Sequence, residues 1–252
     1  MAVKKNEKND HRSGRTALAL TVILGVMTLA GEAGAEVKPQ FGLEGYGGAN
    51  KLFILSPWIG ARFSLGSEVS LIFRYHYHNF RYDYYGSDGL GGSVLKTMKA
   101  DVSRVSGTVY FNRQRLSGYV NLSYLIGSDN YRGFLADSGL EYKFSDQISG
   151  LWSVYSIREK SVLWHPEETV RWINTYSLRL GMKFWPVKNL AFNPNLYLMK
   201  NSEGVEAVSY SVGLVYSPNW WLALHAYYFR YGETAFYIFR GNYFSAGLNF
   251  YF

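Results

Sequence analysis

The sequence predicts an all-β protein, a transmembrane antiparallel up-and-down β-barrel that follows a cleaved signal peptide. Three observations predict this class. The N-terminus has the organisation of an export signal, the remaining chain alternates apolar and polar residues with period two, and the last such segment ends on Phe252. The strands are long, with about ten residues or more, as a tilted bilayer crossing requires.

The first 35 residues are organised like a secretory signal peptide. A basic segment precedes an apolar run over residues 17–30, and small residues follow up to Ala33 and Ala35. The apolar run is shorter than the ~20 residues of a transmembrane helix, so a single membrane anchor is the weaker interpretation. We expect cleavage after Ala35, which leaves residues 36–252 as the barrel.

The mature chain alternates in a way typical of barrel strands. In residues 69–78 one face is apolar and aromatic, and the other carries Arg74, His76 and His78. The polar faces of such segments are rich in Ser, Gly, Asn and Thr, which suits a confined lumen. The same alternation recurs in residues 116–126, 172–184, 208–216 and 243–252. The segment 148–159 does not fit one register, so its lumen side stays open.

The connections predict the number of strands. Five tight turns are expected near residues 66–68, 113–115, 145–147, 186–189 and 218–219. Longer links are expected at residues 49–53, 81–103, 128–133, 160–170, 201–206 and 232–240. Short periplasmic turns that alternate with longer outer loops give twelve strands with both termini in the periplasm, and ten strands is the main alternative.

The closing segment, Tyr243 to Phe252, resembles the last strand of Gram-negative outer-membrane β-barrel proteins. Phe250 and Phe252 lie on its apolar face, and the strand ends on an aromatic residue. The resemblance implies a place in the cell outer membrane and recognition of this strand by the barrel assembly machinery. The tyrosine-rich closing strands are also loosely similar to small barrels of the YaiO type.

The amino-acid composition excludes several kinds of site and partner. The chain has no Cys, which excludes disulfides, thiolate metal sites and a Cys nucleophile, and which suits an oxidising periplasm. Its aromatic share of 18% fits the girdles of a barrel. For an exported chain the net charge of +7 does not indicate a nucleic-acid partner. Outer-membrane lipid and lipopolysaccharide are the expected partners of rim Lys and Arg residues, and no cofactor is expected.

Several polar residues are candidates for a lumen site. By alternation Arg74, His76 and His78 share the lumen face, and two His at i and i+2 can reach one metal or one anion. His225 and Glu141 are third ligands only if the barrel brings them close. Simple lumen polarity is the preferred interpretation, so no metal site is predicted.

Charge on the lumen side is more informative than any local motif. The residues expected to point inward include more cations than anions, and a basic lumen favours passing anions. The alternative is that these groups pair with one another or with lipid phosphates. The cations are Arg74, Arg171, Arg179, Lys143 and Lys183, and the anions are Asp137 and Glu141.

Three functions follow from this pattern. The first is a passive channel for small solutes, with a weak preference for anions. The second is an export or partner-bound barrel that serves a polysaccharide or another envelope complex. The third is an enzyme that modifies envelope lipids, but His225 is expected in the lumen and no catalytic residues are assigned, so we expect no enzyme. The link over residues 81–103 is long enough to fill the lumen.

Overall fold

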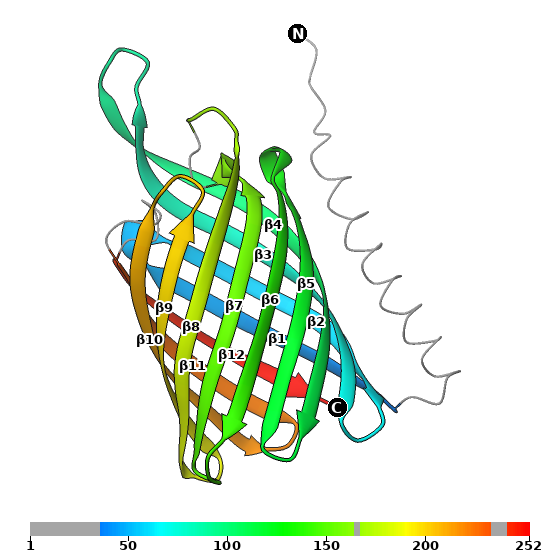
Figure 1. Ribbon diagram of the computed structural model, residues 1–252. Helices are drawn as coiled ribbons and strands as arrows, with labels where there is room; N and C mark the ends of the chain where they lie inside the picture. Colours follow the sequence, from blue (N-terminus) through cyan, green and yellow to red (C-terminus); the bar gives the residue numbers. More distant parts are fainter. Residues whose placement is uncertain (1–35, 164–166, 233–240) are drawn as a thin grey trace.

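The computed structural model describes residues 36–163, 167–232 and 241–252 (Figure 1). The predicted signal peptide, with its cleavage residues Ala33 and Ala35, lies outside the described residues. Among the described residues, no helix is long and apolar enough to cross a membrane.

The described chain forms one closed barrel of twelve antiparallel strands in sequence order (Figure 1). This confirms the predicted fold and strand number. The strands are β1 (Glu36–Gly48), β2 (Phe53–Leu65), β3 (Val69–Ser87), β4 (Ser93–Arg113), β5 (Leu116–Gly127), β6 (Arg132–Lys143), β7 (Ile148–Lys160), β8 (Trp172–Val187), β9 (Leu190–Asn201), β10 (Glu206–Asn219), β11 (Leu222–Tyr231) and β12 (Gly241–Tyr251). Three short 3-10 helices lie in the connections: η1 (Ala49–Lys51), η2 (Ser128–Asn130) and η3 (Ser161–Leu163).

The first and last strands close the barrel. Their register runs from Gln40 opposite Tyr251 to Gly48 opposite Tyr243. The N–H of Phe252 donates to the carbonyl of Pro39 at 3.0 Å, which extends this pairing to the last residue. A closed barrel leaves no unpaired strand edge, and this is the condition for a sheet to span a bilayer.

The wall is apolar outside and polar inside. On β10, Ser209 and Ser211 face the lumen and are 1% exposed, whereas Val208 and Tyr210 face outward and are 59% and 43% exposed. The exposed outer belt includes Val120, Leu122, Leu140, Val154, Leu178, Leu196, Leu198, Val212 and Leu214. An outward apolar belt with a polar interior is the pattern of a membrane barrel.

The five tight turns lie at the predicted end of the barrel, with small shifts. The strand β10 runs through the predicted turn at residues 218–219, and the chain reverses at Trp220 and Trp221 instead. The Asn219 side chain stabilises this turn, because its Oδ1 accepts N–H groups of Trp221 at 3.3 Å and Leu222 at 2.9 Å. We call the opposite end, which carries the longer connections, the outer end.

The prediction of a loop over residues 81–103 is wrong. The strands β3 and β4 continue through most of it as a paired hairpin, which projects beyond the barrel rim (Figure 1). Only residues 88–92 form the turn, where the Asp88 side chain accepts the N–H groups of Leu90 and Gly92, both at 2.8 Å. The tyrosines and β-branched residues of this segment favour strand, so the segment extends the wall instead of filling the lumen.

Apolar side chains pack across the outer end of the lumen. One cluster gathers Val102, Leu125, Tyr131, Leu135, Ile157, Val162 and Leu163 with neighbours on β3, β4 and β7. A second cluster joins Leu52, Tyr82 and Tyr243. The Tyr82 hydroxyl donates to the carbonyl of Leu163 and links the two clusters. The helix η3 therefore folds over the mouth and narrows it.

Candidate functional site: the barrel lumen

The lumen contains a cavity of about 330 Å³, which we call the aromatic chamber. Lumen-facing side chains of β5 to β11 supply most of its lining, so it lies inside the wall. The lining comprises Tyr119, Asp137, Ser153, Tyr155, Ser177, Arg179, Tyr197, Met199, Ser209, Tyr210, Phe229, Arg230 and Tyr231. A cavity lined by aromatic faces with a few polar groups is typical of a small-molecule site.

Arg179 on β8 is a fixed cation of the aromatic chamber. Its Nε donates to Asn195 Oδ1 at 2.9 Å, and its guanidinium lies 5.9 Å from the centre of the Tyr197 ring. A smaller cavity of about 70 Å³ shares Arg179, Tyr119 and Ser153 and continues to residues near the tight turns. Arg179 therefore borders two successive spaces along the lumen.

Arg74 lies on the lumen face of β3, as the alternation predicts. Its Nη2 donates to Gln40 Oε1 at 3.2 Å, and its guanidinium lies 4.7 Å from the centre of the Trp58 ring. Within the described part of the chain, Arg74 Nε and Trp58 Nε1 are buried donors with no hydrogen-bond acceptor. Buried donors without an acceptor are uncommon in folded proteins.

Two further lumen arginines were missed in the sequence. Arg62 donates from Nε and Nη2 to Ser70 Oγ at 3.0 and 2.9 Å, and Arg104 donates from Nε to Ser123 Oγ at 3.1 Å. Arg104 directly follows the predicted loop and alternates with outward Val105, and this alternation is the signal that could have found it. Each of these four lumen arginines of the described residues thus donates a hydrogen bond to a neutral side chain.

One predicted lumen cation is bound to a carboxylate. Lys183 Nζ lies 2.8 Å from Glu141 Oε2, with both side chains largely buried. The other oxygen of Glu141 accepts the Ser149 hydroxyl at 2.7 Å. Within the described chain, Glu141 is therefore a partner of Lys183 and not of a histidine.

The other lumen carboxylates are held by tyrosines. Both oxygens of Asp137 accept the Tyr119 hydroxyl at 3.1 Å, and Glu159 accepts the Tyr131 hydroxyl. The positions of Glu159 and Tyr155 also settle the register of β7, which the sequence left open: its odd-numbered residues face the lumen. Hydrogen bonds from neutral tyrosine hydroxyls orient both of these carboxylates.

The two histidines of β3 are close, but they are bonded as lumen side chains. The rings of His76 and His78 stack at 5.6 Å, and His78 Nδ1 lies 2.7 Å from Ser56 Oγ. His225 is elsewhere in the lumen, with Nε2 at 4.0 Å from Glu44 Oε1. In the described ranges, no group of three or more His, Asp or Glu side chains is placed to hold a metal ion.

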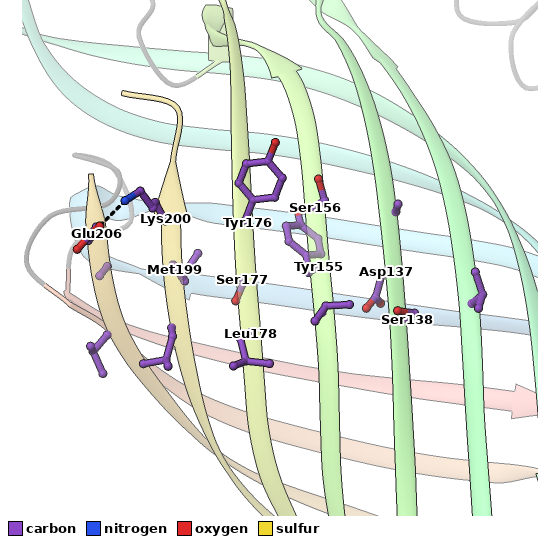
Figure 2. A pocket seen from close by; sticks show the side chains of 16 residues that line it. Asp137, Ser138, Tyr155, Ser156, Tyr176, Ser177, Leu178, Met199, Lys200 and Glu206 are labelled. Carbon is purple, nitrogen blue, oxygen red and sulfur yellow. Dashed lines mark hydrogen bonds and ion pairs between the residues drawn. The ribbon is translucent and has the colours of Figure 1, made fainter. Parts of the chain in front are cut away.

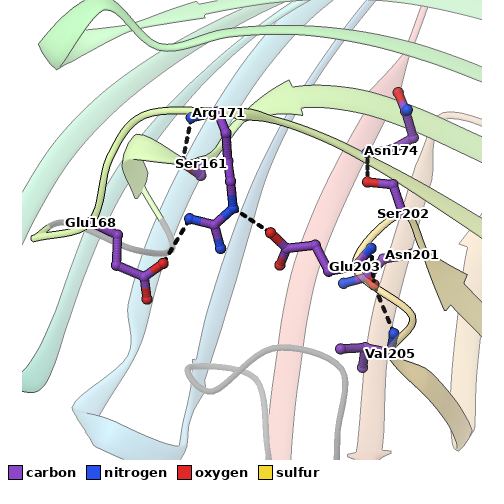
Figure 3. Close-up of polar contacts among 8 residues, drawn as sticks. All are labelled: Ser161, Glu168, Arg171, Asn174, Asn201, Ser202, Glu203 and Val205. Atoms are coloured by element: carbon purple, nitrogen blue, oxygen red, sulfur yellow. Dashed lines mark hydrogen bonds and ion pairs between the residues drawn. The ribbon is translucent and has the colours of Figure 1, made fainter.

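Arg171 and Lys143 differ from the other predicted lumen cations. Arg171 precedes β8, and its guanidinium contacts Glu168 at 2.7 Å and also Glu203 (Figure 3). The pairing of two outer connections, β7–β8 and β9–β10, explains why it is not part of the lumen wall. Lys143 is exposed at the last position of β6, at the end with the tight turns.

A larger hollow of about 830 Å³ follows one level of the wall across six strands, β5 to β10 (Figure 2). Its lining mixes outward residues such as Tyr176 and Leu178 with lumen-facing Asp137 and Tyr155. At one edge Lys200 Nζ lies 2.6 Å from Glu206 Oε1 (Figure 2). Lys200 and Glu206 neutralise each other at this edge. The positive charge of the lumen is therefore supplied by the arginines inside the barrel.

A closed twelve-stranded barrel with an apolar belt and a polar, arginine-containing lumen defines an outer-membrane β-barrel. This confirms the predicted class and the predicted place in the cell outer membrane. No family model matches the chain, and no curated protein matches it. The comparisons do not confirm the likeness to the YaiO type.

Solved structures share this fold. The chain is similar to the KdgM porin in complex with disordered oligogalacturonate, with TM-score 0.56 and 11% identity over 85% of this chain and 99% of that one. It is similar to the NanC porin, with TM-score 0.56 and 8% identity over 83% and 98% of the two chains. An outer membrane channel from Pseudomonas putida F1 gives TM-score 0.58 and 8% identity over 86% and 95%. Similarity at these identities establishes the fold alone.

Proposed function

We propose that this protein is a passive channel for small solutes with a preference for anions. The observation that carries the proposal is the set of lumen arginines, Arg62, Arg74, Arg104 and Arg179, whose guanidinium groups bond to neutral side chains. Fixed cations in a narrow lumen lower the energy of a passing anion and raise that of a cation. The similar porin fold with bound oligogalacturonate supports a solute path through a barrel of this kind.

The channel is tested by solute entry into liposomes that contain the purified barrel. We expect swelling in solutions of small sugars and small organic anions, because the aromatic chamber and the smaller cavity form successive spaces along the lumen. Large dextrans should not enter. Liposomes with the barrel that swell no faster than empty ones would remove the proposal.

The anion preference is tested by substituting lumen arginines. Arg104→Gln and Arg179→Gln should each lower the ratio of anion to cation permeability by about fivefold, the factor for an interaction of about 1 kcal/mol. Arg158→Gln is the matched control, because Arg158 is an exposed outward residue of β7. An equal effect of all three substitutions would assign the preference to overall charge instead of the lumen.

The proposal assigns no enzymatic activity to the chain. Ser56 and His78 are hydrogen-bonded, but both face the lumen, away from the lipids that a lipid-modifying enzyme must reach. Alanine substitutions at His76, His78 and His225 should leave the lipid profile of the envelope unchanged by mass spectrometry. Outer-membrane lipid, lipopolysaccharide and the barrel assembly machinery stay predicted partners.

A further inference from the structure

We propose that the aromatic chamber is a binding subsite for sugar rings that carry a carboxylate, with the rings of β11 as its platform and Arg179 as its anion contact. The inference rests on the proposed channel function and gives its solute a chemical class. According to this inference, the lumen selects solutes by the shape of their ring as well as by their charge.

The platform is a continuous row of rings on the lumen face of β11. His225, Tyr227, Phe229 and Tyr231 occupy consecutive inward positions, with neighbouring ring centres 5.8, 5.8 and 6.2 Å apart. Tyr243 on β12 continues the row at 5.3 Å from Tyr231. Alternate residues of a strand lie about 6.7 Å apart, so the backbone itself sets this spacing. The result is an apolar strip that runs along the lumen to its outer end.

The chamber pairs this strip with polar groups. Phe229 and Tyr231 line it beside Tyr155 and Tyr197, and Arg179 supplies a guanidinium. Its polar lining also includes the side chains of Asp137, Ser153, Ser177 and Ser209.

A pyranose ring matches both parts of this lining. Its C–H faces are apolar and lie flat against aromatic rings, whereas its hydroxyl rim exchanges hydrogen bonds with serines and a carboxylate. A carboxylate on the ring fits Arg179, because a guanidinium presents a planar set of donors. The volume of about 330 Å³ is at the lower end for ligand pockets, which limits the occupant to one or two rings.

The ring platform distinguishes this solute class from small anions in general. Arg179 by itself attracts an open-chain carboxylate as strongly as a cyclic one. Aromatic rings in the lining can favour the cyclic compound, and Phe229 and Tyr231 are the rings that β11 supplies. Affinity for a ring relative to an open chain therefore isolates the inference from the anion preference.

The experiment compares two ligands on the detergent-solubilised barrel by isothermal titration calorimetry. Methyl glucuronide has a locked ring, and gluconate is an open chain, while each has one carboxylate and several hydroxyls. We expect methyl glucuronide to bind about tenfold more tightly, as ring stacking contacts of this kind provide. Equal affinities, or no measurable binding of either ligand, would overturn the inference.

Variants locate the preference in the chamber. The double variant Phe229→Leu with Tyr231→Leu should bind both ligands equally, and Arg179→Gln should weaken both to a similar extent. Phe134→Leu is the matched control, because Phe134 is an exposed outward residue of β6. A preference for the ring that survives in the double variant would overturn the assignment to β11. If this variant fails to fold, the affinities of the two ligands for the unaltered barrel still test the inference.

The outcome separates this inference from the proposed function. Solute entry into liposomes with equal affinity for the two ligands would leave an anion channel without a ring subsite. Preferential binding of methyl glucuronide without any solute entry would leave a subsite in a barrel that is not a channel.

Discussion

At the scale of single residues, a lumen cation that pairs with a carboxylate and a lumen cation that bonds to neutral groups have different effects on ion preference. Lys183 is neutralised by Glu141 at 2.8 Å, whereas the four lumen arginines bond to neutral groups. A pair inside a narrow space contributes little to ion preference until one partner is removed. The two members of this pair therefore lead to opposite predictions.

Removal of the Glu141 charge should make the barrel more selective for anions. Glu141→Gln frees the charge of Lys183, and we expect a rise of about fivefold in the ratio of anion to cation permeability. Lys183→Met should lower the ratio. Glu206→Gln is the control, because the Lys200–Glu206 pair is exposed. Bi-ionic potentials of the three variants give the ratios, and a fall with Glu141→Gln would contradict the assignment.

Lumen residues could be predicted only where the strand itself was recognised. Alternation placed Arg74 and Arg179 inward, and the structure agrees in both cases. Arg104 was missed because the first half of its strand was taken as a loop, which left the alternation of the remaining half unread. The bonding of each cation could not be predicted, because partners such as Glu141 and Lys183 lie on β6 and β8 and meet only in the closed barrel.

At the scale of elements, the projecting β3–β4 hairpin is held by the β7–β8 connection. Glu167 accepts the N–H of Ser87 at 2.7 Å and pairs with Lys96. The bond with Lys96 and then the Ser87 N–H lower the pKa of Glu167. The hairpin was not predicted from sequence, because its polar tyrosine- and glycine-rich tip resembles a loop until pairing of the two strands is known.

The contacts of Glu167 with Ser87 and Lys96 form a latch on the hairpin, and this latch should weaken as pH falls. Because the folded pKa of Glu167 is lowered, the latch is complete above the ordinary value of 4.5 and is lost as pH falls through the folded value. Glu167→Gln should remove it at every pH. Exchange of the Ser87 amide, corrected for intrinsic rates, measures the change, with Glu68→Gln at the opposite end as control. Ser87 protection that is independent of pH would contradict the latch.

The closing strand gives a prediction about assembly. Phe41 stacks on Phe250 at 4.6 Å and on Phe252 at 5.6 Å, so these rings join β1 to β12. Phe252→Ala should reduce the folded fraction in the outer membrane, because it removes both a contact at the seam and the predicted assembly signal. Phe144→Ala, which lies at the same end away from the seam, is the control. The folded fraction is measured by faster gel migration of unheated samples, and equal yields would contradict the role of Phe252.

At the scale of the whole molecule, the sequence predicts the barrel architecture more completely than it predicts the packing inside the lumen. Period-two alternation and the count of turns gave twelve strands, because each strand carries its own inside and outside in sequence. The packing at the outer end could not be predicted. It depends on Tyr82 and Leu163, which are far apart in the chain and meet only when the barrel closes.

The central claim is that ions pass through an arginine-containing lumen. The most direct measurement is the zero-current potential of the purified barrel in a planar bilayer under a potassium chloride gradient. The account predicts discrete conductance steps and a potential with the sign set by chloride. Absence of steps, or a potential with the sign set by potassium, would contradict it.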